Sequence, residues 1–114
     1  TNPEFIDRFT QWHAAWESLD VEKYLKFYSP TFNNFKKDYK TWVAHKRRID
    51  KQKSFIRVGV ENLATVSYPS AEGEMMVADF YQRYVSNNYK SSSGKRQYWL
   101  KSKQGWKIIF EDSY

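Results

Sequence analysis

The sequence predicts an α+β fold with helices in its first half and an antiparallel sheet in its second. Apolar residues recur with helical spacing as far as about Lys53 and alternate with polar residues after it. The alternating segments are joined by hairpin-length turns such as "AEGE" and "KQG". Helices first and strands afterwards favour the α+β class. With 114 residues, of which 40% are hydrophobic and 19% aromatic, the chain suits one compact domain over residues 1–114.

Three helices are expected before the sheet. In the first, Asn2 is a suitable cap and Pro3 a suitable first residue. Its apolar stripe follows steps of four, three, four and three residues and consists of Phe5, Phe9, Trp12, Trp16 and Leu19. Asp20 caps a short second helix over 21–29, which Pro30 ends. Residues 31–37 are expected to form a loop before a third helix over 38–50.

The strands follow from the alternating pattern. They are expected at 55–60 (continuing or pairing through 64–68), 75–86, 96–102 and 106–111. The polar segment "NNYKSSSG", residues 87–94, is expected to be a hairpin loop. A strand as long as 75–86 usually needs bending. A bent sheet wrapped on a long helix leaves a concave pocket.

Charge and composition narrow the functional classes only slightly. The net charge is +6, and residues 36–53 alone carry eight Lys or Arg and two Asp. Basic faces of this kind attract anions, but they are also common on ordinary domains. The chain has no cysteine, which excludes thiolate nucleophiles and disulfides. No apolar run approaches the roughly 20 residues of a membrane-spanning helix, so no membrane span is expected. The start at Thr1, without methionine, suggests a processed or excised piece.

Two stretches of the sequence resemble a known family. "WHAAWESLDVEKYLKFYSPTF" resembles the W-x3-W-x3-D-x3-YL-x2-Y opening of nuclear transport factor 2-like (NTF2-like) domains. "FYQRYVSNNYKSSSGKRQYWLKSKQGWKIIFE" resembles the F-x-Q-x-Y-x-S, K and W-K-I-x3-E pattern of their second half. Within that fold, the chain is most similar to the accessory domains attached to bacterial L,D-transpeptidase and L,D-carboxypeptidase proteins, which trim or cross-link peptidoglycan.

The resemblance implies a cone, cystatin-like in outline, with three N-terminal helices packed on a curved antiparallel sheet and a ligand often held at its mouth. It also implies a periplasmic or cell-envelope location and a catalytic sister domain elsewhere in the protein. The cysteine of that catalytic domain is absent here, so its chemistry does not transfer to this chain. NTF2-like domains frequently pair through the open sheet face, which makes a homodimer an expectation by analogy.

The candidate site is a polar row at the end of the long strand. Ala78, Phe80, Gln82, Tyr84 and Ser86 share one face by alternation. On a concave sheet the first two would lie deep, and the last three would line the opening. Aromatic walls with a few convergent polar groups are typical of small-molecule and sugar sites. The alternative is a closed core in which Gln82 and Tyr84 satisfy one another and the backbone.

Further residues are expected near this row. Lys95 and Trp99 alternate onto one face of the next strand, and the parity of Glu111 leaves its direction open. Tyr24 and Tyr28, one helical turn apart, are expected either in the core or in the pocket wall. Trp16 is expected to face the sheet, or to lie at the rim where it can stack on a sugar.

The functional expectation is a non-catalytic domain that binds a peptidoglycan fragment or a small polar or aromatic ligand. The alternative is a small-molecule isomerase or dehydratase of the same fold, with Glu74, Asp79 or Glu111 as its general base. No cofactor is expected. His13 and His45 stand without metal-ligand spacing, so no metal site is expected either. Nucleic-acid binding is not expected, because the aromatic residues follow core periods and no RNA-binding signature is present.

Overall fold

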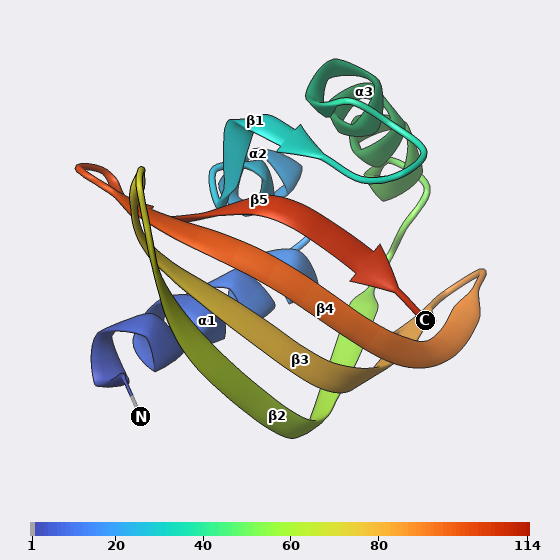
Figure 1. Cartoon of the computed structure of the whole chain (residues 1–114). Helices are drawn as coiled ribbons and strands as arrows, with labels where there is room; N and C mark the ends of the chain where they lie inside the picture. The colour runs from blue at the N-terminus through green and yellow to red at the C-terminus, as the bar shows by residue number, and fades with distance from the viewer. Residues whose placement is uncertain (1) are drawn as a thin grey trace.

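A strongly curled five-stranded sheet wraps around the first helix in the computed structural model, which describes residues 2–114 (Figure 1). In chain order, the elements are α1 (Pro3–Glu17), α2 (Val21–Leu25), β1 (Tyr28–Asn33), α3 (Tyr39–Asp50), β2 (Ile56–Ser70), β3 (Gly73–Ser86), β4 (Lys90–Ser102) and β5 (Gly105–Ser113). The strand order across the sheet is β1-β5-β4-β3-β2. The α+β class with a curved sheet is therefore confirmed.

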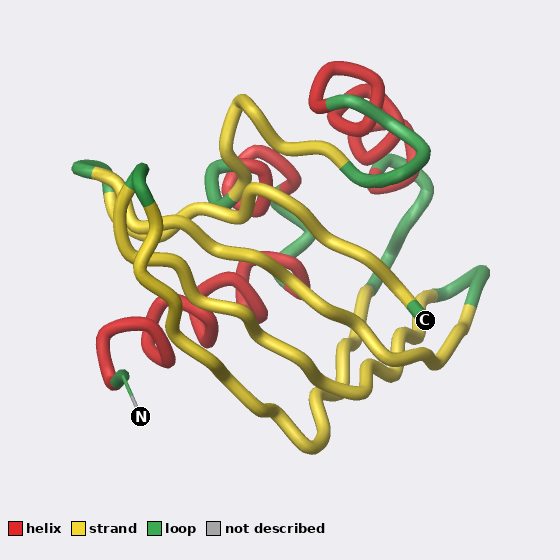
Figure 2. Tube along the Cα trace, in the orientation of Figure 1, coloured by secondary structure: helices red, strands yellow, loops and turns green. Residues whose placement is uncertain are grey.

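The sheet is antiparallel from β2 to β5, as the short turns predict, and within residues 2–114 only β1 pairs in parallel, with β5. Figure 2 shows the short loops that join the antiparallel strands. β2 runs without interruption through both segments that the sequence suggested for it. A bulge between Glu61 and Ala64, with Asn62 at a φ of 57°, bends it. The bulge adds a residue to one strand of the pair and increases its twist. The long strands therefore curl into a bowl instead of lying flat.

α1 lies across the concave face of the bowl (Figure 1). The Oδ1 atom of Asn2 accepts a hydrogen bond from the Phe5 backbone nitrogen at 3.1 Å, which is the predicted cap. Near the end of the helix, Glu17 Oε2 accepts from the Val58 backbone nitrogen at 2.8 Å, and His13 Nε2 contacts the Val58 carbonyl. These two side chains bind the backbone of the edge strand β2, because no neighbouring strand is there to pair with it.

The core between α1 and the sheet is aromatic. The Phe5 ring meets the rings of Trp99 and Trp106 edge-on, at centroid distances of 5.3 and 5.4 Å. Phe9 meets Phe80 in the same way at 5.3 Å. Edge-to-face pairs at these distances add to the stabilisation from buried area. The predicted stripe of α1 thus makes the core contacts, and it fixes the helix against β3, β4 and β5.

The prediction for residues 21–37 was wrong in one respect. The second helix ends at Leu25, and Tyr28–Asn33 forms strand β1 between the second and third helices. Tyr28 follows Tyr24 at a step of four and both are buried, so this pair mimicked a continuing helical stripe. Pro30 is compatible with this strand because β1 lies at the edge of the sheet, where a missing backbone N–H leaves no ladder bond unmade.

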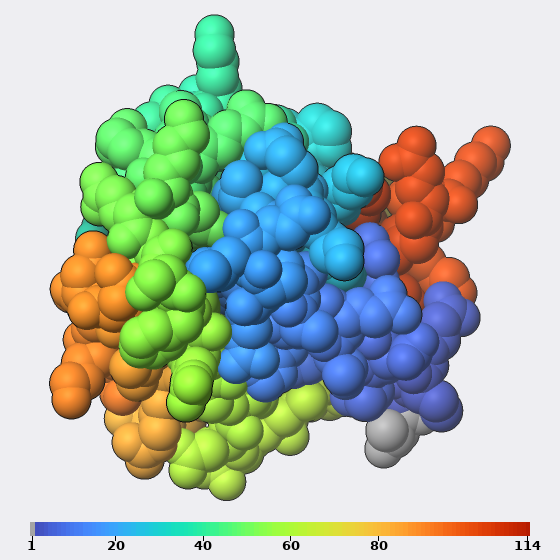
Figure 3. Space-filling model, turned by 180° about the vertical axis from the view of Figure 1, so that it is seen from behind, coloured from blue at the N-terminus to red at the C-terminus, as the bar shows by residue number. Residues whose placement is uncertain are grey.

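The expected loop over 87–94 was also too long. β4 begins at Lys90, and Ser91, Ser92 and Ser93 pair with Tyr84, Arg83 and Gln82 of β3. Serine clusters are typical of loops, but here the partner strand supplies the hydrogen bonds. The turn of the β3–β4 hairpin therefore spans only residues 87–89, and it lies beside the segment that follows α3, where Lys53 and Ser54 bind Asn88 and Asn87. Figure 3 shows this hairpin in orange against the green residues that follow α3.

Candidate functional site

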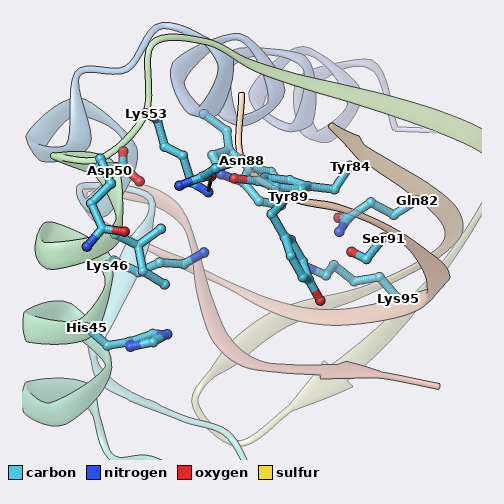
Figure 4. Close-up of a pocket in the computed structure, with 13 residues that line it drawn as sticks. His45, Lys46, Asp50, Lys53, Gln82, Tyr84, Asn88, Tyr89, Ser91 and Lys95 are labelled. Carbon is cyan, nitrogen blue, oxygen red and sulfur yellow. Dashed lines mark hydrogen bonds between the residues drawn. The ribbon is translucent and has the colours of Figure 1, made fainter. Parts of the chain in front are cut away.

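A pocket of about 550 Å³ lies at the end of the bowl that carries the β3–β4 hairpin. It lies between the concave ends of β3 and β4, the end of α1, helix α3 and the segment that follows α3 (Figure 4). The residues that line it are Trp16, His45, Lys46, Ile49, Asp50, Gln52, Lys53, Gln82, Tyr84, Asn88, Tyr89, Ser91 and Lys95. Its position at the mouth of the curled sheet is the one that the long bent strand predicts.

Aromatic rings form one wall of this pocket. Trp16 is buried and packs against Tyr84 at a centroid distance of 5.5 Å, and Tyr84 in turn contacts Tyr89 at 6.2 Å. Tyr89 belongs to the β3–β4 hairpin and is 61% exposed, so it stands at the rim. A ligand entering the pocket would therefore meet a run of rings that extends from solvent to the core.

Three lysines reach into the pocket from two sides. The ammonium groups of Lys46 and Lys95 lie 5.1 and 4.9 Å from the centre of the Trp16 ring, close enough for cation–π attraction. Lys53 donates to Ser86 Oγ at 3.0 Å and to Asn88 Oδ1 at 2.5 Å. Lys53 is thus bound to the hairpin, and Lys46 and Lys95 face the cavity.

The environment of Lys46 lowers its pKa to about 8. Burial among aromatic rings is the main cause, and repulsion from Lys95 adds to it, while Glu111 and Asp50 act in the opposite direction. Lys46 is half-buried, and its ammonium group lies near the rings of Trp16, Tyr24 and Trp42. The positive charge of Lys46 is therefore only weakly balanced by negative groups of the domain.

Gln82 provides the clearest sign of a missing partner. Its side chain is only 6% exposed, yet its Oε1 atom makes no hydrogen bond within residues 2–114. Figure 4 shows the amide directed into the pocket beside Ser91 and Lys95. A buried acceptor without a donor costs about 1–3 kcal/mol, so such groups are rare unless water or a ligand satisfies them.

A buried polar network lies behind the pocket, centred on Glu111. Its carboxylate accepts hydrogen bonds from Tyr28 Oη at 3.0 Å, Gln97 Nε2 at 2.7 Å and Lys95 Nζ at 3.4 Å. Burial raises the pKa of Glu111, but the charge of Lys95 and the bond from Gln97 outweigh it, and the net pKa lies below the ordinary value. Glu111 is therefore ionised and pairs with the ammonium group of Lys95.

The structure separates the predicted site residues into two groups. Trp16, Gln82, Tyr84 and Lys95 line the pocket, and Ser86 lies just outside it, in contact with Lys53. The remaining predicted residues are buried behind the pocket and do not line it: Tyr24, Tyr28, Trp99 and Glu111.

These four residues are connected to the pocket through hydrogen bonds and, for Tyr24, through ring packing against Trp16 at a centroid distance of 5.5 Å. Tyr24 and Tyr28 meet through their hydroxyls at 2.8 Å, although they lie on different elements and not on one helix. Trp99 donates from its indole nitrogen to Gln97, which holds Glu111. Their role in the fold is to support the pocket floor.

Sequence reasoning missed the contribution of α3 and the hairpin. It assigned Lys46 to a basic surface, and it did not consider Asp50 or Tyr89 for the site. Trp42, Lys46, Asp50 and Lys53 follow one another at steps of four, four and three, which is the same helical spacing that identified the core stripe of α1. That signal was present, but charged residues in such a stripe are normally solvated.

No helix in residues 2–114 is long and apolar enough to cross a membrane. Within the same residues, no group of three or more His, Cys, Asp or Glu side chains is arranged to hold a metal ion. Asp79 points to the convex side of the sheet, where it pairs with Arg96 at 2.8 Å.

A curled antiparallel sheet closed by helices, with a pocket at its mouth, defines an NTF2-like, cystatin-like domain. Residues 4–112 match the family described as the Cds6 C-terminal NTF2-like domain, and the chain belongs to this family. No curated protein sequence matches the chain.

Solved structures agree with the family. The chain is 31% identical to Bd1075 from Bdellovibrio bacteriovorus, with a TM-score of 0.84 over 96% of this chain and 40% of that one. It is 26% identical to the helical cell shape determining protein Pgp2 from Campylobacter jejuni, with a TM-score of 0.77 over 91% of this chain and 38% of that one. The chain thus spans about two fifths of the length of these two proteins. An NTF2-like protein of unknown function from Pseudomonas putida, 15% identical with a TM-score of 0.76, shares the fold across 96% of this chain and 84% of its own.

Proposed function

We propose that this chain is a ligand-binding accessory domain of a cell-envelope protein that processes peptidoglycan, and that it binds a cell-wall fragment in the pocket. The observation that carries this proposal is the unpaired, buried Gln82 Oε1, which faces a cavity with an aromatic wall and the ammonium group of Lys46. A pocket of this composition has what a sugar or peptide ligand requires, namely rings to pack against and a few oriented polar groups.

The relatives support the cell-wall part of the proposal. Pgp2 is a helical cell shape determining protein, and the shape of a bacterial cell is set by its peptidoglycan. The relatives also continue well beyond the matched region, which leaves room for a catalytic domain beside this one. The chain would then act in the periplasm, and its part would be to hold substrate for that domain.

The test is retention of the purified domain on peptidoglycan sacculi. Gln82→Ala and Tyr84→Ala are expected to weaken retention because they remove a polar group and a ring from the pocket. Tyr81→Ala is the matched control, since Tyr81 lies on the same strand but outside the pocket lining and is 37% exposed. Circular dichroism verifies that each variant is folded. Retention that is unchanged in both pocket variants would refute the proposed site.

The pocket also holds one group that suits the alternative, a small-molecule enzyme of the same fold. Asp50 lines the cavity, and burial raises its pKa above the ordinary value, although Lys46 and Lys53 partly oppose this. A carboxylate with a raised pKa in a pocket is a typical general base. If the chain turns over a carbonyl substrate, Asp50→Asn is expected to abolish turnover while leaving the fold intact. Activity that survives this change would exclude Asp50 as the base.

A further inference from the structure

The balance of charge in the pocket indicates what kind of ligand it accepts. The lysine and carboxylate side chains that line the cavity are Lys46, Lys53, Lys95 and Asp50, and Glu111 lies directly behind them. His45 also lines it, but burial and nearby cations lower the pKa of its imidazole and favour the neutral form. Glu111 pairs with Lys95 at 3.4 Å. Among residues 2–114, no carboxylate lies within ion-pair distance of the Lys46 ammonium group. Three cations against two anions leave one positive charge uncompensated.

The uncompensated charge lies where a ligand can reach it. Figure 4 shows Lys46 and Lys95 extending toward one another from α3 and β4, across the cavity. Both ammonium groups contact the same Trp16 ring, which fixes them at the inner end of the pocket. An anion placed there would receive charge-assisted hydrogen bonds from two lysines, in a site where water only partly screens the attraction.

Gln82 adds a second requirement. Its Oε1 atom is an acceptor, so a ligand that satisfies it must present an N–H or O–H donor. The Gln82 side chain and the Lys95 side chain lie next to each other in the cavity (Figure 4). The donor of the ligand must therefore be close to its negative group, as the amide N–H of an N-acyl amino acid is close to its carboxylate.

On the basis of the proposed function, we infer that the pocket recognises a peptide carboxylate of the cell-wall fragment, bound by Lys46 and Lys95, with the neighbouring amide N–H donating to Gln82 Oε1. A single carboxylate matches the single uncompensated charge. The aromatic wall of Trp16, Tyr84 and Tyr89 then packs against the remainder of the ligand. The peptide, and not the sugar, is the part of the fragment that carries recognition.

The test compares two forms of one compound by isothermal titration calorimetry. The first is the soluble disaccharide-peptide that a muramidase releases from peptidoglycan, and the second is the same compound with its carboxylates converted to primary amides. The amide form is expected to bind roughly tenfold more weakly or worse, since a hydrogen bond to a charged group contributes about 1.5–3 kcal/mol.

Variants of Lys46 test whether this lysine causes the preference for the carboxylate form. Lys46→Gln is expected to weaken binding of the carboxylate form to the level of the amide form, and Lys46→Arg is expected to keep the preference. Lys101→Gln is the matched control, because Lys101 lies outside the pocket and pairs with Glu4 at 3.0 Å. This change should leave both affinities as they are.

The outcomes separate the inference from the proposed function. Equal binding of the two forms would overturn the carboxylate inference and leave the peptidoglycan-binding function intact. Failure of both forms to bind would overturn the proposed function, and the inference with it. A preference that persists in Lys46→Gln would mean that the carboxylate lies elsewhere, which also overturns the inference.

Discussion

Replacing Glu111 by glutamine tests the network that supports the pocket floor. The change keeps the size of the side chain but removes the charge that faces Lys95. Lys95 is only 7% exposed and Glu111 9%, so the lysine would remain buried opposite a neutral amide. Removing one partner of a buried ion pair costs about 3–5 kcal/mol. We expect the lower end, about 3 kcal/mol, because the Lys95 ammonium group also lies over the Trp16 ring and at the wall of the pocket.

Thermal unfolding followed by circular dichroism measures this cost. A loss of 3 kcal/mol corresponds to a decrease in Tm of roughly 12 °C, at about 4 °C per kcal/mol for a domain of this length. The matched control is Glu61→Gln, whose carboxylate pairs with Arg83 at an exposed site and should change stability by about 0.5 kcal/mol or less. The double variant Glu111→Gln with Lys95→Met should regain much of the loss, since no unpaired charge remains.

The pH dependence gives an independent check on the same residue. Because the folded pKa of Glu111 lies below its unfolded value, ionised Glu111 stabilises the fold fully above about pH 4.3, the ordinary pKa of glutamate. That contribution is lost as the pH falls through the folded pKa. The difference between wild type and Glu111→Gln should therefore narrow in acid. A Tm decrease below about 3 °C at pH 7 would refute this account of the network.

Two further predictions concern the pocket itself. Gln82→Met removes the unpaired acceptor and should raise stability in urea by about 0.5–1 kcal/mol while weakening retention on sacculi. Unchanged stability would mean that the Oε1 atom is already satisfied. Lys46 gives up its proton in the folded state at about pH 8, so wild-type stability should rise from there toward pH 10. Lys46→Met should lack this rise, and an equal slope in both proteins would assign it to another group.

Local patterns predicted those parts of the fold that local geometry decides. The alternation in β3 placed Ala78, Phe80, Gln82, Tyr84 and Ser86 on one face, and all five are buried on the concave side of the sheet. The stripe of α1 was equally readable, because every step of it is set by the helical period. Strand alternation and the helical period depend only on residues close in the sequence, so they can be predicted without knowing which distant segments pack together.

The features that sequence reasoning missed depend on contacts between segments far apart in the chain. β1 exists because Tyr28 pairs beside Ile108, and nothing in residues 21–37 distinguishes that outcome from a longer helix. Ser91, Ser92 and Ser93 adopt strand structure because they pair with β3. Lys46 faces the pocket because α3 packs against the mouth of the bowl and not over its centre. The composition of the pocket could therefore be anticipated only in part.

The most direct test of the pocket is a ¹⁵N–¹H NMR titration with the muramidase-released disaccharide-peptide. The account predicts that the indole signal of Trp16 and the side-chain amide signal of Gln82 shift on binding, while the indole signal of Trp106 in the core stays in place. Signals that shift only at the convex face, around Tyr68 and Tyr98, with Trp16 and Gln82 unchanged, would contradict it.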